Sequence, residues 1–137
     1  MKKVISVTLV IALLLTVLSL PATARASTHI ASYSIDIFPR GNGRVEVIVS
    51  VIGTHRNMTR IGFPSIALFE STNNGSTWTP VRSTGSWNPN TPAGSHTHTF
   101  TYQGVAGRWY YASASFWAQD TQGHDSKSAN SRIITAT

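Results

Sequence analysis

The chain has 137 residues, which is the length of one ordinary domain. It contains no cysteine, so disulfide bonds, thiolate metal sites and a cysteine nucleophile are excluded. Charged residues make up 12% of the chain and aromatic residues 9%. This balance is too apolar for a disordered chain and too weakly charged for a long solvated helix.

The first 26 residues have the organisation of a secretory signal peptide. Lys2 and Lys3 precede an apolar run over residues 4–20, and Ala24 and Ala26 form a small-x-small cleavage site. The apolar run is also about the minimum length that spans a bilayer, so a retained membrane anchor is the alternative. We expect cleavage after Ala26 and a secreted, extracellular protein of bacterial type.

The predicted mature chain, residues 27–137, is expected to be a single domain. Removal of the leader lowers the formal net charge from +6 to +3, because it takes away Lys2, Lys3 and Arg25 and no acidic residue. The remaining basic residues are spread along the chain, which argues against nucleic acid as a partner. No apolar tail or lipid-bearing cysteine follows, so no membrane contact is expected after cleavage.

The first half of the mature chain predicts short strands. Residues 30–38 are rich in β-branched and aromatic types, and residues 40–43 form a glycine-rich turn. In residues 44–52 every second position is a valine, which places four valines on the core face of a strand. Residues 61–70 predict a third strand, which Pro64 bends or places at an edge. Asn74-Gly75 predicts a hairpin into residues 77–81.

The second half continues the same pattern after a polar stretch. Residues 83–94 contain two prolines and predict a loop or an irregular crossing. Residues 96–102 and 108–119 alternate as strands, and residues 128–136 predict the last one. About seven short strands separated by turns are typical of an all-β, antiparallel sandwich.

Two segments resemble fibronectin type III and immunoglobulin-like domains. Residues 68–78, with Asn-Gly followed by Ser-Thr-Trp, resemble the hairpin after the third strand of such domains. Residues 107–110, Gly-Arg-Trp-Tyr, followed by a turn at residues 120–123, resemble the entry to the sixth strand and the turn after it. The resemblance implies that Tyr110 is a corner tyrosine, tied to the preceding loop.

The resemblance covers about residues 61–134 and departs from the family pattern in two places. The segment 108–119 is longer than the family's strand, and residues 44–52 lack the tryptophan usual on its second strand. The chain is similar also to small, uncharacterised exported sandwich proteins of bacteria. Such domains bind or space other parts far more often than they catalyse, and the fold by itself implies no ligand.

The residues that could carry out chemistry form no catalytic motif. The mature chain has five acidic residues, each expected at a turn or on an outer strand face. Neither a Gly-x-Ser-x-Gly elbow nor a phosphate-binding glycine loop is present. We therefore expect no enzyme activity, no catalytic residue and no cofactor.

His96 and His98 are the residues most similar to a metal site. Histidines two apart on a strand point to the same side and can chelate a divalent ion, but zinc needs further ligands. The sequence does not show that His29, His55 or His124 converge on this pair, so we expect exposed histidines and no metal site. A histidine-based metal-binding protein is the weaker alternative.

The outer side of residues 108–119 is the candidate binding surface. Trp109, Tyr111 and Trp117 share one face of the strand, with serines between them. If Tyr110 is a corner tyrosine, Tyr110, Phe116 and the alanines face the core. The aromatic side then faces outward, where it could stack on sugars or anchor a protein. The alternative is that these rings only cover the sheet or pair across strands with Phe69, Trp78 or Tyr102.

The favoured hypothesis is a secreted, non-enzymatic sandwich that acts by surface binding at or outside the cell envelope. The alternative is a carbohydrate or cell-wall binding module that uses Trp109, Tyr111 and Trp117. Its partner would be a cell-wall glycan or an extracellular protein. An assembling subunit is also open, because the predicted edge strands at residues 30–38 and 128–136 could pair between chains.

Overall fold

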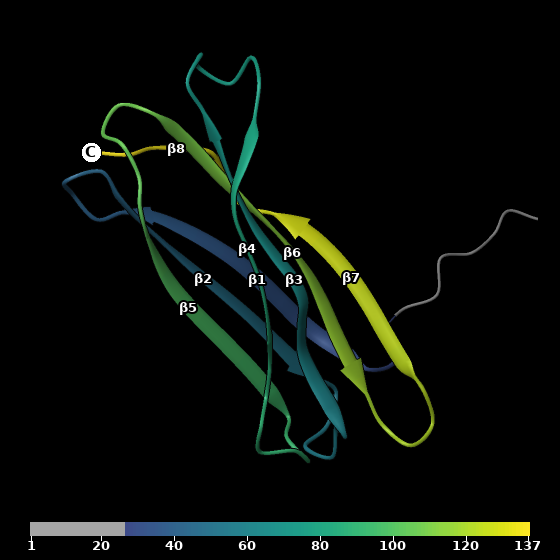
Figure 1. The fold of residues 1–137 in the computed structure, drawn as a ribbon. Helices are drawn as coiled ribbons and strands as arrows, with labels where there is room; N and C mark the ends of the chain where they lie inside the picture. Colours follow the sequence, from purple (N-terminus) through teal and green to yellow (C-terminus); the bar gives the residue numbers. More distant parts are fainter. Residues whose placement is uncertain (1–26) are drawn as a thin grey trace, which may run out of the picture.

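The structure is a computed structural model that describes residues 27–137, and the predicted signal peptide lies outside the described residues. Two antiparallel sheets pack face to face, and residues 27–137 contain no helix (Figure 1). The predicted all-β sandwich is therefore confirmed.

Eight strands follow one another along the chain. They are β1 (Ile30–Pro39), β2 (Arg44–Gly53), β3 (Arg60–Ser71), β4 (Thr79–Trp87), β5 (Ser95–Gln103), β6 (Trp109–Gln119), β7 (His124–Asn130) and β8 (Ile134–Thr135). One sheet has the order β1-β2-β5. The other has the order β4-β3-β6-β7, and the short β8 pairs with the start of β6.

Alternate residues of the central strands fill the space between the two sheets. Val45, Val47, Val49 and Val51 of β2 are fully buried, as the period of two predicts. Strand β6 presents its buried residues to these valines from the opposite sheet. The buried side of β6 consists of Tyr110, Ala112, Ala114, Phe116 and Ala118. The residues between them, including all the aromatic ones predicted as a platform, therefore point outward.

Two predicted strand boundaries are wrong, and both concern edge strands. The loop predicted over residues 83–94 begins only after Trp87, because β4 covers its first part. The last strand, predicted over residues 128–136, starts earlier as β7 and is interrupted before β8. Edge strands contribute little to the core, so β4 and β7 carry polar residues on both sides and lack the apolar alternation that marks the central strands.

A polar contact fixes the point where β6 begins. The hydroxyl of the buried Tyr110 accepts a hydrogen bond from the Val105 N–H at 2.9 Å and donates one to Glu70. Arg108 donates to the other oxygen of the Glu70 carboxylate at 2.9 Å. Burial, followed by the bond to Glu70, raises the pKa of Tyr110 to about 12. The resemblance implies this link between Tyr110 and the preceding loop, and the link sets which β6 residues face outward.

Candidate functional site

Strand β6 brings three predicted site residues onto one side. Trp109, Tyr111 and Trp117 point outward and are each half-buried. Trp117 follows Tyr111 by six positions of extended strand, which corresponds to about 20 Å. The three rings therefore do not form one continuous platform. Trp109 and Tyr111 lie near the start of β6 and Trp117 lies near its end, and we call these two regions the first and the second aromatic end.

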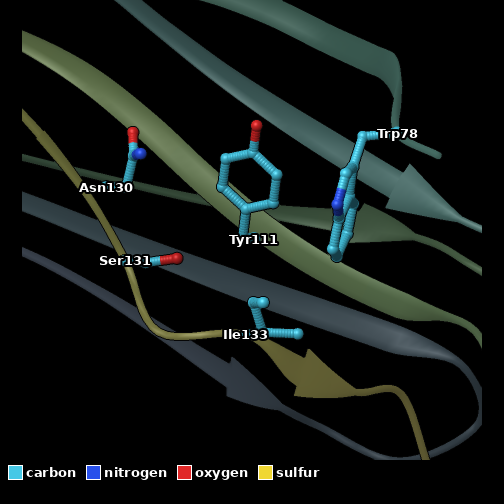
Figure 2. Close-up of a pocket in the computed structure, with 5 residues that line it drawn as sticks. All are labelled: Trp78, Tyr111, Asn130, Ser131 and Ile133. Atoms are coloured by element: carbon cyan, nitrogen blue, oxygen red, sulfur yellow. The ribbon is translucent and has the colours of Figure 1, made fainter. Parts of the chain in front are cut away.

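The first aromatic end surrounds Tyr111. Phe69 of β3 stacks on the Tyr111 ring, with 4.9 Å between the centroids and 10° between the planes. Trp78, just before β4, meets the Tyr111 ring at 4.7 Å and 83°. A pocket of about 270 Å³ opens beside these rings. Figure 2 shows its lining residues, which are Trp78, Tyr111, Asn130, Ser131 and Ile133.

Trp109 is covered by the tip of the β3–β4 hairpin. Asn74 and Gly75 at this tip have positive φ angles of 54° and 84°, as the Asn-Gly pair predicts. A Cβ atom on Gly75 would lie 3.2 Å from Cζ3 of Trp109, so the turn backbone rests against the indole. Trp109 thus supports the hairpin that carries Trp78 and does not line the pocket.

The second aromatic end lies near the other end of β6. Trp117 stacks on His124 of β7, with 4.0 Å between the centroids and 13° between the planes. In the neighbouring strands, Gly62 of β3 pairs with both Trp117 and Trp87. The Arg60 guanidinium lies 3.9 Å from the centre of the Trp87 ring, a cation–π contact. Trp87, expected in a loop, is therefore part of the sheet surface.

All four tryptophans of the chain lie on the outer side of the five-stranded sheet. We call this surface, which β4, β3, β6 and β7 form with Trp78, Trp87, Trp109 and Trp117, the tryptophan face. Between its two aromatic ends the register places small, uncharged side chains outward. They are Ser65, Ala67, Ser83, Ser113, Ser115, Ser126, Ser128 and Asn130. Among residues 27–137, no charged side chain points outward between the two ends.

His96 and His98 do not occupy the exposed position that the sequence predicts. They pair with Val51 and Val49 of β2 and therefore face the inner side at the edge of the sandwich. His96 Nε2 lies 2.8 Å from the hydroxyl of Ser86. Burial, and then the charge of His98, lowers the pKa of His96. Among residues 27–137, no three histidine or acidic side chains are arranged to hold a metal ion.

Sequence reasoning missed a cluster at the end of the sandwich far from the pocket. Asp120, in the turn after β6, lies 3.0 Å from His29 Nε2 and 2.9 Å from His55 Nε2. Asp125 of β7 lies 3.4 Å from His29 Nδ1. We call these four residues the histidine–aspartate cluster. It joins the segment before β1 to the β2–β3 loop and to the β6–β7 turn.

Both carboxylates of this cluster are held in their charged form. The backbone N–H of Gln122 is the main cause that lowers the pKa of Asp120 to about 2, and the two histidines add to it. The hydroxyl of Ser27 is the main cause that lowers the pKa of Asp125 to about 2. Asp120 thus caps a turn, as expected for an acidic residue here, and in addition holds two imidazoles.

Comparison of the chain with protein-family models, with curated proteins and with solved structures found no match in any of the three. Within residues 27–137, no helix is long and apolar enough to cross a membrane. The function of the chain must therefore be inferred from its own geometry.

Proposed function

We propose that the chain is an exported, non-enzymatic β-sandwich that acts by surface binding through the tryptophan face. One observation carries this proposal: all four tryptophans lie on one outer sheet surface, and this surface has a pocket lined by Trp78 and Tyr111. Tryptophan and tyrosine dominate binding surfaces because they bury a large area with few rotatable bonds. The outer side of the three-stranded sheet, in contrast, has no tryptophan.

Two features support a relationship to fibronectin type III and immunoglobulin-like domains. The orders β1-β2-β5 and β4-β3-β6-β7 resemble the constant-type immunoglobulin arrangement, with one difference. Here the fourth strand pairs with the third strand and so belongs to the second sheet, whereas in the constant-type arrangement it belongs to the first sheet. Tyr110, the second residue of the sixth strand, accepts a hydrogen bond from the loop before it, as a corner tyrosine does. These domains act mainly as binding modules.

Export is supported by the leader pattern and tested by the position of the mature N-terminus. When the full chain is expressed in a secreting bacterial host, we expect protein in the medium with Ser27 as its first residue. Intact-mass measurement and N-terminal sequencing decide this. A protein that begins at Met1 and stays with the membrane fraction would show that the leader is an anchor.

The arrangement of the acidic residues supports a binding role over a catalytic one, because three of them are engaged in hydrogen bonds within the fold. Asp120 and Asp125 hold backbone and histidine groups, and Glu70 holds Tyr110 and Arg108. Thr28, His29 and Asp120 do form a hydrogen-bonded series, with 2.8 Å and 3.0 Å between the joined atoms. Thr28, however, lies on an exposed segment at the opposite end of the sandwich from the pocket.

The binding role can be tested without knowing the ligand. Isolated cell envelopes of the producing bacterium are mixed with the purified protein, and the retained fraction is measured after washing. We expect retention of the natural sequence and its loss on Tyr111→Ala and on Trp78→Ala. Ile52→Ala is the control, since Ile52 is 47% exposed and lies on β2 in the other sheet, away from the tryptophan face. Equal retention of all variants would contradict the proposal.

A further inference from the structure

The Tyr111 ring has one covered and one open face. Phe69 stacks on it from β3, whereas the pocket residues Asn130, Ser131 and Ile133 come from β7 and the segment after it. Because β3 and β7 flank β6 on opposite sides, the pocket lies on the ring face that Phe69 leaves free. Figure 2 shows the Tyr111 ring between Asn130 and Trp78.

The pocket offers an aromatic floor and neutral hydrogen-bonding groups. Its lining consists of two aromatic residues, one aliphatic residue, one amide and one hydroxyl, without a charged residue. Within residues 27–137, the Tyr111 hydroxyl, the Trp78 indole N–H and the Asn130 amide form no side-chain hydrogen bond, so all three can contact a ligand. A volume of about 270 Å³ lies just below the range for drug-sized ligands, so it suits a single ring.

The surface beyond the pocket continues the same chemistry. From Tyr111 the outward residues of β6 are Ser113 and Ser115, and the hydroxyl of Ser115 accepts a hydrogen bond from Ser65 at 3.2 Å. Exposed serines of β7 extend this hydroxyl surface to one side. Trp117 ends it about 20 Å from Tyr111. A ligand lying here would meet an aromatic ring, a row of hydroxyls and a second aromatic ring in that order.

We propose that this surface binds a neutral, linear glycan, with one sugar ring stacked on Tyr111 in the pocket and the chain extending over the serines toward Trp117. The inference rests on the proposed function, because it assumes that the tryptophan face is the binding surface. The apolar C–H side of a sugar ring packs on the electron-rich face of an aromatic ring, and its hydroxyls match the serines and Asn130. Between the two aromatic ends, within residues 27–137, no charged side chain points outward, which favours a neutral glycan over an anionic one. A proline-rich peptide would fill the aromatic end but would bring no hydroxyl groups to the serines.

Titration calorimetry with soluble oligosaccharides tests this inference. The probes are neutral chito-, cello- and manno-oligosaccharides of one to six rings, and a proline-rich decapeptide serves as the competing ligand class. We expect at least one sugar series to bind, with an affinity that rises with chain length and then levels off once Trp117 is reached. Tyr111→Ala should weaken every member of that series at least about tenfold, as loss of a central aromatic anchor does.

Two further variants separate a lost contact from a damaged fold. Trp117→Ala should weaken only the longer members of the series and leave the shortest binders within about twofold of the natural sequence. Asn130→Ala removes an exposed amide, so it should lower affinity without changing the urea midpoint. Ile52→Ala is again the control.

The results that would overturn the glycan inference differ from those that would overturn the proposed function. The glycan inference fails if no sugar series binds, if Tyr111→Ala binds sugar as tightly as the natural sequence does, or if only the peptide binds. In each of these cases Tyr111-dependent retention on cell envelopes would still support the tryptophan face as a binding surface with a protein partner. If neither sugar binding nor Tyr111-dependent retention on cell envelopes is observed, both proposals are contradicted.

Discussion

The hydroxyl of Tyr110 donates a hydrogen bond to Glu70, and this contact ties the start of β6 to the end of β3. The same hydroxyl accepts from the Val105 N–H, so one oxygen joins two strands and a loop. Because Tyr110 and Tyr111 are adjacent in a strand, fixing Tyr110 inward fixes Tyr111 outward. The inner contact thereby positions the candidate binding surface on the other side of the sheet.

Tyr110→Phe should destabilise the fold while keeping the ring packing. The substitution removes the hydrogen-bond partner of one Glu70 oxygen and of the Val105 N–H, which costs about 1 to 3 kcal/mol for groups of this kind. Urea unfolding at neutral pH measures the difference. Tyr102→Phe is the control, because Tyr102 packs near Tyr110 with 6.3 Å between the ring centroids and makes no such bond within residues 27–137. An equal loss in both variants would contradict the assignment.

The fold should lose stability at high pH through the same residue. The pKa of Tyr110 is raised from its usual 10.0 to about 12, mainly by burial, so the folded chain disfavours the charged form. The contribution of the neutral Tyr110 hydroxyl to the stability of the fold is complete below about pH 10 and is lost as the pH rises from about 10 to about 12. The urea midpoint of the natural sequence should fall across this window. In Tyr110→Phe the fall should be smaller, and an unchanged pH profile would refute the coupling.

The central strands could be predicted from sequence because each has one fully buried side. The valines of β2 predict the inward face that the folded chain has. The alternation in β6 separates its two faces, and the resemblance of Tyr110 to a corner tyrosine indicates which of them is the inner one. The bounds of β4 and β7 could not be predicted, since every residue of these two edge strands is exposed or half-buried and most of them are polar. What defines such a strand is its hydrogen bonds to a neighbour, and these are not visible in its own composition.

The candidate site could be predicted only where one strand supplies it. Tyr111 and Trp117 share β6, so the period of two placed them on one face. Trp78 comes to Tyr111 from the segment before β4 and Asn130 from the end of β7, and His29 meets Asp120 across 91 positions of the chain. Strand register and the packing at the ends of the sandwich decide such contacts, and a single sequence carries no direct signal for either.

Acid should weaken the fold through the histidine–aspartate cluster. Asp120 and Asp125 both have a pKa lowered from the usual 3.8 to about 2, so their stabilisation is complete above about pH 4 and is lost as the pH falls toward 2. Asp120→Asn and Asp125→Asn should each lower the urea midpoint at pH 7 and flatten its fall in acid. Asp36→Asn, on the exposed side of β1, is the matched control and should follow the natural profile.

The edge strand β7 should keep the chain from pairing with other copies. Lys127 pairs with the buried Phe116 and therefore points to the inner side of the sandwich, and Asp125 does the same opposite Ala118. Inward charges on an edge strand discourage a second chain from adding to the sheet, because pairing would bury them. Lys127→Val should raise the weight-average mass at micromolar concentration in light scattering. Lys127→Arg keeps the charge and should remain monomeric; association of the natural sequence itself would instead favour the assembling-subunit alternative.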